Sequence, residues 1–181
     1  LDWIKQRAML FRGALLGTML RHDTYYFSQL GTFIERADNT ARILDVKYYI
    51  LLPKPSDVGS DVDIQQWSTV LRSVSAHRAY RWFYRDSTYR PWLVAEFLIL
   101  REAMPRSLIF CYQWLTRSLD GLGELYGQRY ECQNEASDLY ARLKAGNMDD
   151  IFQSGLHEFL QDFVNANNRI AAQIAQTYNF P

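Results

Sequence analysis

The chain has 181 residues, a length that suits one domain and is enough to bury a hydrophobic core. Its 20 basic and 20 acidic side chains give a formal net charge of zero, which argues against a general electrostatic affinity for nucleic acid or for an anionic membrane. No apolar run approaches the roughly 18 residues of a membrane span. We therefore expect one globular domain over residues 1–181, with no membrane contact.

The cysteine content is low. Cys111 and Cys132 are the only two cysteines, and they suggest neither a disulfide framework nor a metal cluster. This usage is typical of a reducing cytoplasm, where we expect the protein to act. No signal-peptide pattern opens the chain. The first residue is Leu1 rather than Met, which suggests a fragment of a longer protein or a processed chain.

The first predicted helix covers about residues 2–20, where apolar residues recur at spacings of three and four. Gly13 and Gly17 lie inside it, and each costs roughly 1 kcal/mol of helix stability relative to alanine. Their spacing of four residues indicates that they permit a close contact with another helix.

The second predicted helix, over about residues 24–52, is the longest in the chain. Asp23 or Thr24 is expected to cap it, and it ends before Pro53. Gly31 in its interior suggests a close backbone approach. Its apolar stripe alternates spacings of three and four, and consists of Phe27, Leu30, Ile34, Ala37, Ala41, Leu44, Tyr48 and Leu51.

A charged edge flanks this stripe. Its members, again three or four residues apart, are Glu35, Asp38, Arg42 and Asp45. Three carboxylates and a guanidinium along a buried face are unusual, and this edge is our candidate site for a ligand, substrate or partner. The alternative is a network of ion pairs that only fixes the packing of the helix. Arg36 lies about 100° around the helix from Glu35, so the two side chains are expected to make different contacts.

Loop and short-helix signals follow. Residues 53–63 contain proline, glycine and serine and predict a loop. Asp63 is expected to cap the next helix, which continues to about residue 74, and a short helix is expected over residues 77–84. Residues 85–90 are polar and turn-like.

Arginines and aromatic residues alternate over residues 78–92. Such a segment can bind phosphates and stack on bases, or it can form cation–π packing at a corner of a helical bundle. Because the net charge is zero, we favour packing or a protein contact and keep nucleic-acid binding as the weaker alternative.

Pro91 is expected to start a helix over residues 91–100 that is apolar on nearly every side and therefore central. Glu96 is its only interior charge. A buried carboxylate needs a cationic or hydrogen-bonding partner, and we predict Arg106 for this role. A structural ion pair is favoured here over a catalytic group.

Three further helices complete the expected fold. They cover residues 105–126, beginning at Pro105, then residues 134–144, ending at a Gly146 cap, and residues 149–178. No segment shows the alternation and turn chemistry of β-strands. The sequence therefore predicts an all-α fold, a helical bundle of about seven or eight helices.

Metal and cofactor motifs are absent from the sequence. His157 begins a zincin-like pattern, but Gln161 replaces the second histidine, so one helical turn cannot offer two imidazoles to a metal. No Glu-x-x-His pair, glycine-rich phosphate loop or nucleophile elbow occurs. Cys111 is expected to be a core thiol. We predict no metal and no cofactor.

The long helix also resembles a known family. The sequence Leu-Gly-Thr-Phe-Ile-Glu-Arg-Ala-Asp-Asn-Thr-Ala-Arg-Ile-Leu-Asp at residues 30–45 is similar to that of the bacterial alpha-E family, which is named for an α-helical domain with a Glu-Arg motif. Members commonly carry this motif twice and often have Arg where this chain has Thr32. Here it occurs once, at Glu35-Arg36, which suggests the C-terminal half of a longer member. The resemblance extends through residues 11–19, 75–81, 95–100, 104–108 and 155–160.

The resemblance implies an association with circularly permuted ATP-grasp ligases and transglutaminase-like proteins, in a system that makes or modifies peptides. We therefore expect an accessory or interaction module that binds such a ligase or its peptide substrate. An N-terminal half or a second copy of the chain is a further expected partner. The candidate binding residues are Glu35, Arg36, Asp38, Arg42, Asp45, His77, Glu96 and Arg106.

The main alternative is an enzyme in which Glu35 acts as an acid or base, or in ligand transfer, beside Arg36 or Arg42. A cavity lined by the charged edge would favour a ligand or substrate site. A fully paired edge without a cavity would favour a structural role.

Overall fold

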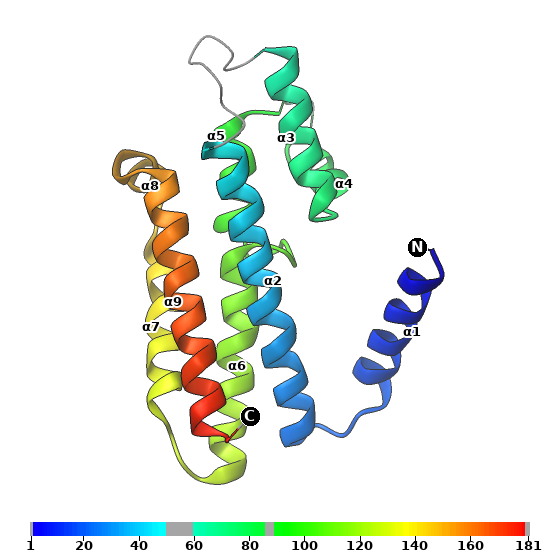
Figure 1. Cartoon of the computed structure of the whole chain (residues 1–181), viewed down its shortest axis with the longest axis vertical. Helices are drawn as coiled ribbons and strands as arrows, with labels where there is room; N and C mark the ends of the chain where they lie inside the picture. The colour runs from blue at the N-terminus through cyan, green and yellow to red at the C-terminus, as the bar shows by residue number, and fades with distance from the viewer. Residues whose placement is uncertain (1, 50–59, 86–88, 180–181) are drawn as a thin grey trace.

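The computed structural model describes residues 2–49, 60–85 and 89–179. Over these ranges the chain is helical and has no strand, which confirms the all-α class. Figure 1 shows the nine helices of the described residues: α1 (Asp2–Thr18), α2 (Asp23–Tyr49), α3 (Asp61–Ser73), α4 (His77–Phe83), α5 (Pro91–Ile99), α6 (Leu108–Tyr126), α7 (Glu131–Ala145), α8 (Met148–Ser154) and α9 (Leu156–Thr177).

Four long helices form the body of the molecule. α2 runs antiparallel to both α6 and α9, and α7 packs against α6 and α9 (Figure 1). The short helices α5 and α8 cover one end of this bundle. The facing sides of the four long helices are apolar at helical spacing, and they bury residues such as Leu44, Leu115 and Leu160 completely. The stripe predicted for the second helix is therefore the core face of α2 wherever it lies in the described residues.

Two hydrogen bonds of Asn167 connect three of these helices. Tyr112 of α6 donates its hydroxyl to Asn167 Oδ1 of α9 at 2.9 Å, and both side chains are fully buried. The Asn167 amide in turn donates to the backbone carbonyl of Ile34 in α2 at 3.4 Å. Asn167, a polar residue on the apolar face of α9, thus has its hydrogen-bond partners inside the core.

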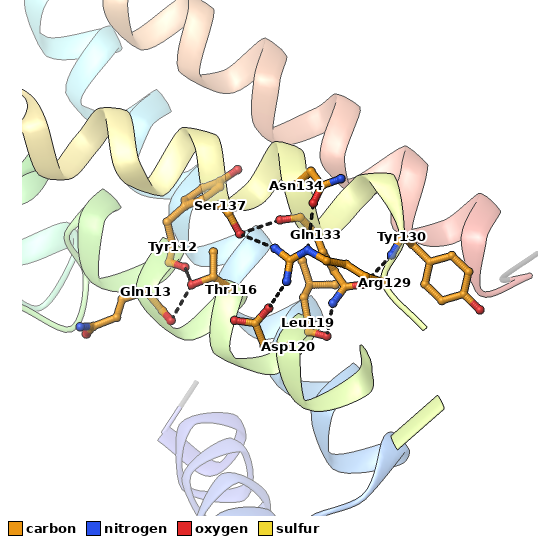
Figure 2. A network of polar contacts seen from close by, with 10 residues as sticks. All are labelled: Tyr112, Gln113, Thr116, Leu119, Asp120, Arg129, Tyr130, Gln133, Asn134 and Ser137. Carbon is orange, nitrogen blue, oxygen red and sulfur yellow. Dashed lines mark hydrogen bonds and ion pairs between the residues drawn. The ribbon is translucent and has the colours of Figure 1, made fainter. Parts of the chain in front are cut away.

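A polar network fixes the corner between α6 and α7 (Figure 2). The Arg129 guanidinium donates to Asp120 Oδ1 at 3.2 Å and to Asn134 Oδ1 at 2.9 Å. The buried Gln133 amide donates to the backbone carbonyl of Leu119 at 3.1 Å. Arg129 is therefore an arginine whose donors are used within the fold.

α3 and α4 lie beside one end of α2 (Figure 1), and their buried residues, such as Trp67 and Tyr80, belong to the hydrophobic core. α1 lies apart from the bundle, joined to α2 by residues 19–22 (Figure 1). None of the α1 residues is buried.

The C-terminal helix differs from its prediction. The segment expected to form one helix over residues 149–178 is divided into α8 and α9 at Gly155, whose φ of 98° ends the first helix. Asn147 caps α8 by accepting from the backbone N–H of Asp150 at 2.9 Å. The apolar spacing continues across the break, so periodicity alone does not reveal it.

Two helix starts also differ. Ser107, not Pro105, caps α6, because its hydroxyl accepts from the backbone N–H of Phe110 at 3.1 Å. α7 begins at Glu131, three residues before its predicted start, where the Gln133 side chain accepts from the backbone N–H of Tyr130. Pro91 does start α5 as predicted.

Asp63 is a core ion-pair residue and does not cap α3. Ser60 caps the helix, accepting from the Asp63 backbone N–H at 3.3 Å. The Asp63 carboxylate instead accepts from Lys47 Nζ at 2.7 Å, and both side chains are almost fully buried. Most of the loop predicted around it, and the end of the helix predicted to residue 52, lie outside the described residues.

Gly146 ends α7 as predicted, but the close helix contacts predicted at three other glycines were wrong. A Cβ atom added at Gly13, Gly17 or Gly31 would meet nothing within 4 Å, so none of them marks a close helix contact. The close approach is at Gly121 of α6, where an added Cβ would lie 2.5 Å from a ring atom of Tyr26.

Candidate functional site

The predicted charged edge of α2 divides into separate contacts. Glu35 is exposed, and the Asn39 amide lies 3.4 Å from its Oε1. Asp38 accepts from Arg42 Nε at 2.7 Å, an ion pair along the helix. Burial leaves Asp38 Oδ1 without a hydrogen-bond partner in the described part of the chain. These side chains do not surround a common space.

Asp45 belongs to a contact between helices. Its two carboxylate oxygens accept from His157 Nδ1 at 2.5 Å and from Gln161 Nε2 at 2.6 Å, both on α9. The histidine and glutamine that resemble part of a zincin pattern thus tie α9 to α2. This contact is separate from those of Glu35 and Asp38.

Glu96 has a different partner from the one predicted. Its carboxylate pairs with Arg101 and accepts from the Tyr84 hydroxyl at 3.0 Å. Burial raises the pKa of Tyr84 to about 12, so its hydroxyl remains protonated at neutral pH. The assignment of Arg106 to Glu96 was wrong, because Arg101 at the end of α5 lies on the side of the turn that faces Glu96. An ion pair at Glu96 was expected, and it forms with Arg101.

His77 lies at the start of α4, away from the charged edge. Its Nε2 and the Tyr89 hydroxyl form a hydrogen bond of 2.6 Å. Burial and the nearby arginines, with Arg72 the strongest, lower the pKa of His77. His77 therefore favours its neutral form and holds the segment before α5 in place.

The arginine and aromatic segment packs into the fold. Tyr80 is buried, with its ring 4.8 Å from that of Tyr84 and 5.6 Å from that of Phe97, so these rings are not available to bases. Trp82, by contrast, is 75% exposed. Packing is thus the main role of the described part of this segment, and residues 86–88 lie outside it.

Arg36 faces a cavity that the charged edge does not reach. This cavity, of about 410 Å³, lies between α1, α2 and the N-terminal part of α6, and we call it the Arg36 slot. Its aromatic lining is Phe11, Tyr25, Phe33, Phe110 and Trp114.

The Arg36 guanidinium is fixed at the wall of this slot. Its Nη1 donates to the backbone carbonyl of Pro105 at 3.0 Å, and its carbon lies 5.0 Å from the centre of the Phe33 ring. Burial lowers the pKa of Arg36, and the nearby Arg106 and Arg12 guanidiniums act in the same direction, whereas the Glu35 carboxylate acts in the opposite direction. Three cations are therefore close together here.

A second cavity, of about 540 Å³, lies between α2 and α3. Arg42 is the one member of the charged edge that lines it, together with the nearly buried Lys47 and a mixture of apolar and uncharged polar residues. Lys47 also donates to Gln66 Oε1 at 2.7 Å and lies 5.0 Å from the Trp67 ring centre, so its charge is fully engaged. The Lys47–Asp63 pair was missed by the sequence analysis because its partners are on different helices.

No group of three histidine, cysteine or acidic side chains in the described ranges is arranged to hold a metal ion. Cys111 is a buried core thiol, and burial raises its pKa to about 12. None of the helices described for this chain is both long enough and apolar enough to cross a membrane.

Comparison with known proteins identifies the family of the chain. A family model named Alpha-E, described as a predicted alpha-helical domain with a conserved ER motif, matches residues 1–179. The chain belongs to the Alpha-E family. No curated protein and no solved structure gives a significant match.

The Glu-Arg dipeptide of this Alpha-E chain has two separate surroundings. Glu35 is exposed to solvent on α2, whereas Arg36 is half-buried against Pro105 and the Phe33 ring. The 100° step between neighbouring helical residues predicts this divergence. No pattern in the sequence predicts the slot, because its walls come from three helices.

Proposed function

We propose that this Alpha-E chain is a non-catalytic interaction module that binds a partner protein through α1. The supporting observation is that none of the 17 residues of α1 is buried, although many of them are large and apolar. Trp3, Met9 and Leu10 are 66%, 73% and 63% exposed. A helix with large apolar residues on all sides is typically covered by another surface.

The charged edge gives less support to an enzyme. A general acid or base must lie within hydrogen-bond reach of its substrate, usually in a pocket. Glu35 is exposed and lines neither the Arg36 slot nor the cavity between α2 and α3. The Asp38 carboxylate is bound to Arg42. An interaction role needs no such arrangement.

The partner that we propose is a circularly permuted ATP-grasp ligase, acting with transglutaminase-like proteins in a bacterial, cytoplasmic system that makes or modifies peptides. Family membership supports this choice, because the resemblance described above carries that association. An N-terminal half of a longer member, or a second copy of the chain, is the other surface that would cover α1.

The test is co-purification of the chain with an ATP-grasp ligase encoded beside it. We expect the double variant Trp3→Ala, Leu10→Ala to lose the complex, because it removes apolar contact area from α1. Trp82→Ala is the matched control, since Trp82 is equally exposed but lies on α4. Circular dichroism of each variant verifies that the bundle is folded.

A complex that survives the α1 double variant contradicts the proposal. Analytical ultracentrifugation of the isolated chain adds a second criterion. If the wild type is a dimer and the double variant is a monomer, a second copy covers α1, and the ligase is not its partner.

A further inference from the structure

The Arg36 slot holds an unsatisfied cation. Burying a charged group without a partner is unfavourable, and buried charges in proteins are normally paired. Within the described residues no carboxylate lies at ion-pair distance from Arg36, and its one hydrogen bond is to the carbonyl of Pro105. By comparison, Arg129 and Arg101 each meet a carboxylate of the same chain. A half-buried guanidinium with free N–H groups is therefore an open position for an anion.

Neighbouring charges strengthen this preference. Arg12 lines the same slot from α1, and Arg106 lies close enough to Arg36 to act on its protonation. Neither forms an ion pair with a carboxylate among the described residues. Three like charges near a partly desolvated site repel one another, and one bound anion would offset that repulsion.

A second polar group in the slot also lacks a partner. Gln29 is only 6% exposed and lines the slot from α2. No hydrogen bond of its side-chain amide is formed within the described part of the chain, and the residue borders the slot. An amide both donates and accepts, so it matches a peptide group in a ligand.

The remaining lining is apolar and aromatic. The Phe33 and Trp114 rings stack with their centroids 6.1 Å apart, and Phe110 lies beside them. The volume of about 410 Å³ is within the usual range for small-ligand sites, roughly 300–1,000 Å³. These walls favour an apolar or aromatic ligand body over a strongly hydrated one such as a polyphosphate.

We propose that the Arg36 slot binds the carboxylate of an acylated amino acid with an apolar or aromatic side chain. Arg36 holds the carboxylate, because its planar fork of donors matches two carboxylate oxygens. Gln29 binds the adjoining amide, and the aromatic walls hold the side chain. This chemistry occurs in a free N-acyl amino acid and at the C-terminus of a peptide. The inference goes beyond the partner docking proposed above and does not depend on it.

The test is isothermal titration of the full chain with N-acetyl-phenylalanine, its primary amide, and acetate alone. We expect the acid to bind at least tenfold more tightly than the amide, which lacks the charge, and than acetate, which lacks the aromatic body. Equal binding of acid and amide, or no binding of the acid at millimolar concentration, would overturn the proposal.

Variants assign the site. Arg36→Gln and, separately, Gln29→Leu should each weaken binding of the acid, the first by about tenfold or more. Arg117→Gln is the matched control, because Arg117 lies over the Trp114 ring at 5.2 Å but is exposed and outside the slot lining. If Arg117→Gln weakens binding as much as Arg36→Gln does, with all variants folded, the slot is not the site.

A peptide arm separates the two sources. A six-residue peptide that ends in a phenylalanine acid is compared with its C-terminal amide and with N-acetyl-phenylalanine. Tighter binding of the peptide acid identifies a peptide C-terminus, and binding of the small acid alone identifies a free metabolite. Both outcomes support the carboxylate site. Because these titrations use the isolated chain, their failure is independent of the co-purification result.

Discussion

At the scale of single residues, some polar side chains of the described structure have partners on other helices, and others have unused hydrogen-bond donors or acceptors. Asp45 and Glu96 are candidate binding groups in the sequence, yet each is bonded to another helix or turn. Arg36 and Gln29 are partly or fully buried and remain available. The proposed binding site therefore rests on such open groups and not on the number of charges along a helix edge.

Removal of the Tyr112 hydroxyl tests the buried bond to Asn167. Tyr112→Phe keeps the ring and leaves Asn167 Oδ1 buried without its donor, so we expect the free energy of unfolding to fall by about 1–3 kcal/mol. Urea denaturation monitored by circular dichroism measures this change. Tyr126→Phe is the control, since its hydroxyl bond to Asp23 is exposed and should matter by less than about 0.5 kcal/mol. Equal effects in both variants would mean that burial does not decide the cost.

Residue partners were the least predictable feature. Four-residue spacing along one helix brings Asp38 and Arg42 within reach of each other, and this pair forms. The partner of Glu96 depends on the direction of the turn after α5, and the partner of Asp45 depends on the packing of α9. Neither is encoded in local spacing.

At the scale of elements, apolar periodicity predicted the helices well because each long helix buries one stripe. The helix ends were harder. Ser107 and Ser60 cap α6 and α3, whereas the sequence pattern favoured the nearby Pro105 and Asp63 as the helix starts. Gly155, with its positive φ, ends α8 although the apolar pattern continues. The Arg36 slot needs α1, α2 and α6 to be placed relative to one another, so no single segment of sequence predicts it.

The contact between α2 and α3 depends on the Lys47–Asp63 ion pair. Lys47→Met or Asp63→Leu alone leaves one buried charge without its partner, and we expect each to lower the free energy of unfolding by about 3–5 kcal/mol. The double variant should lose much less than the sum of the two, because no charge remains unpaired. Urea denaturation of the four proteins forms the double-mutant cycle.

The exposed pair Lys5–Asp2 is the control for this cycle. Its atoms lie 3.8 Å apart on the surface of α1, so Lys5→Met should change stability by well under 1 kcal/mol. Additive effects of Lys47→Met and Asp63→Leu would show that the two charges do not stabilise one another.

At the scale of the whole molecule, the chain divides into a packed bundle and a helix that the bundle does not bury (Figure 1). We expect the core of α2, α6, α7 and α9 to unfold in one cooperative transition, as small single domains usually do. α1 contributes no buried residue to that unit, and an isolated helix of its length is marginal in water. α1 is therefore expected to open locally without unfolding the bundle.

Glycine substitutions test this division. Gly13 in α1 and Gly31 in α2 are both helical, and an added Cβ meets nothing within 4 Å at either position, so alanine should add about 1 kcal/mol of helix stability at each. Gly31→Ala should therefore raise the urea midpoint of the whole bundle. Gly13→Ala should leave that midpoint unchanged and slow amide hydrogen exchange only within α1, by about fivefold. If Gly13→Ala shifts the midpoint as much as Gly31→Ala does, α1 unfolds together with the bundle and is not a separate binding element.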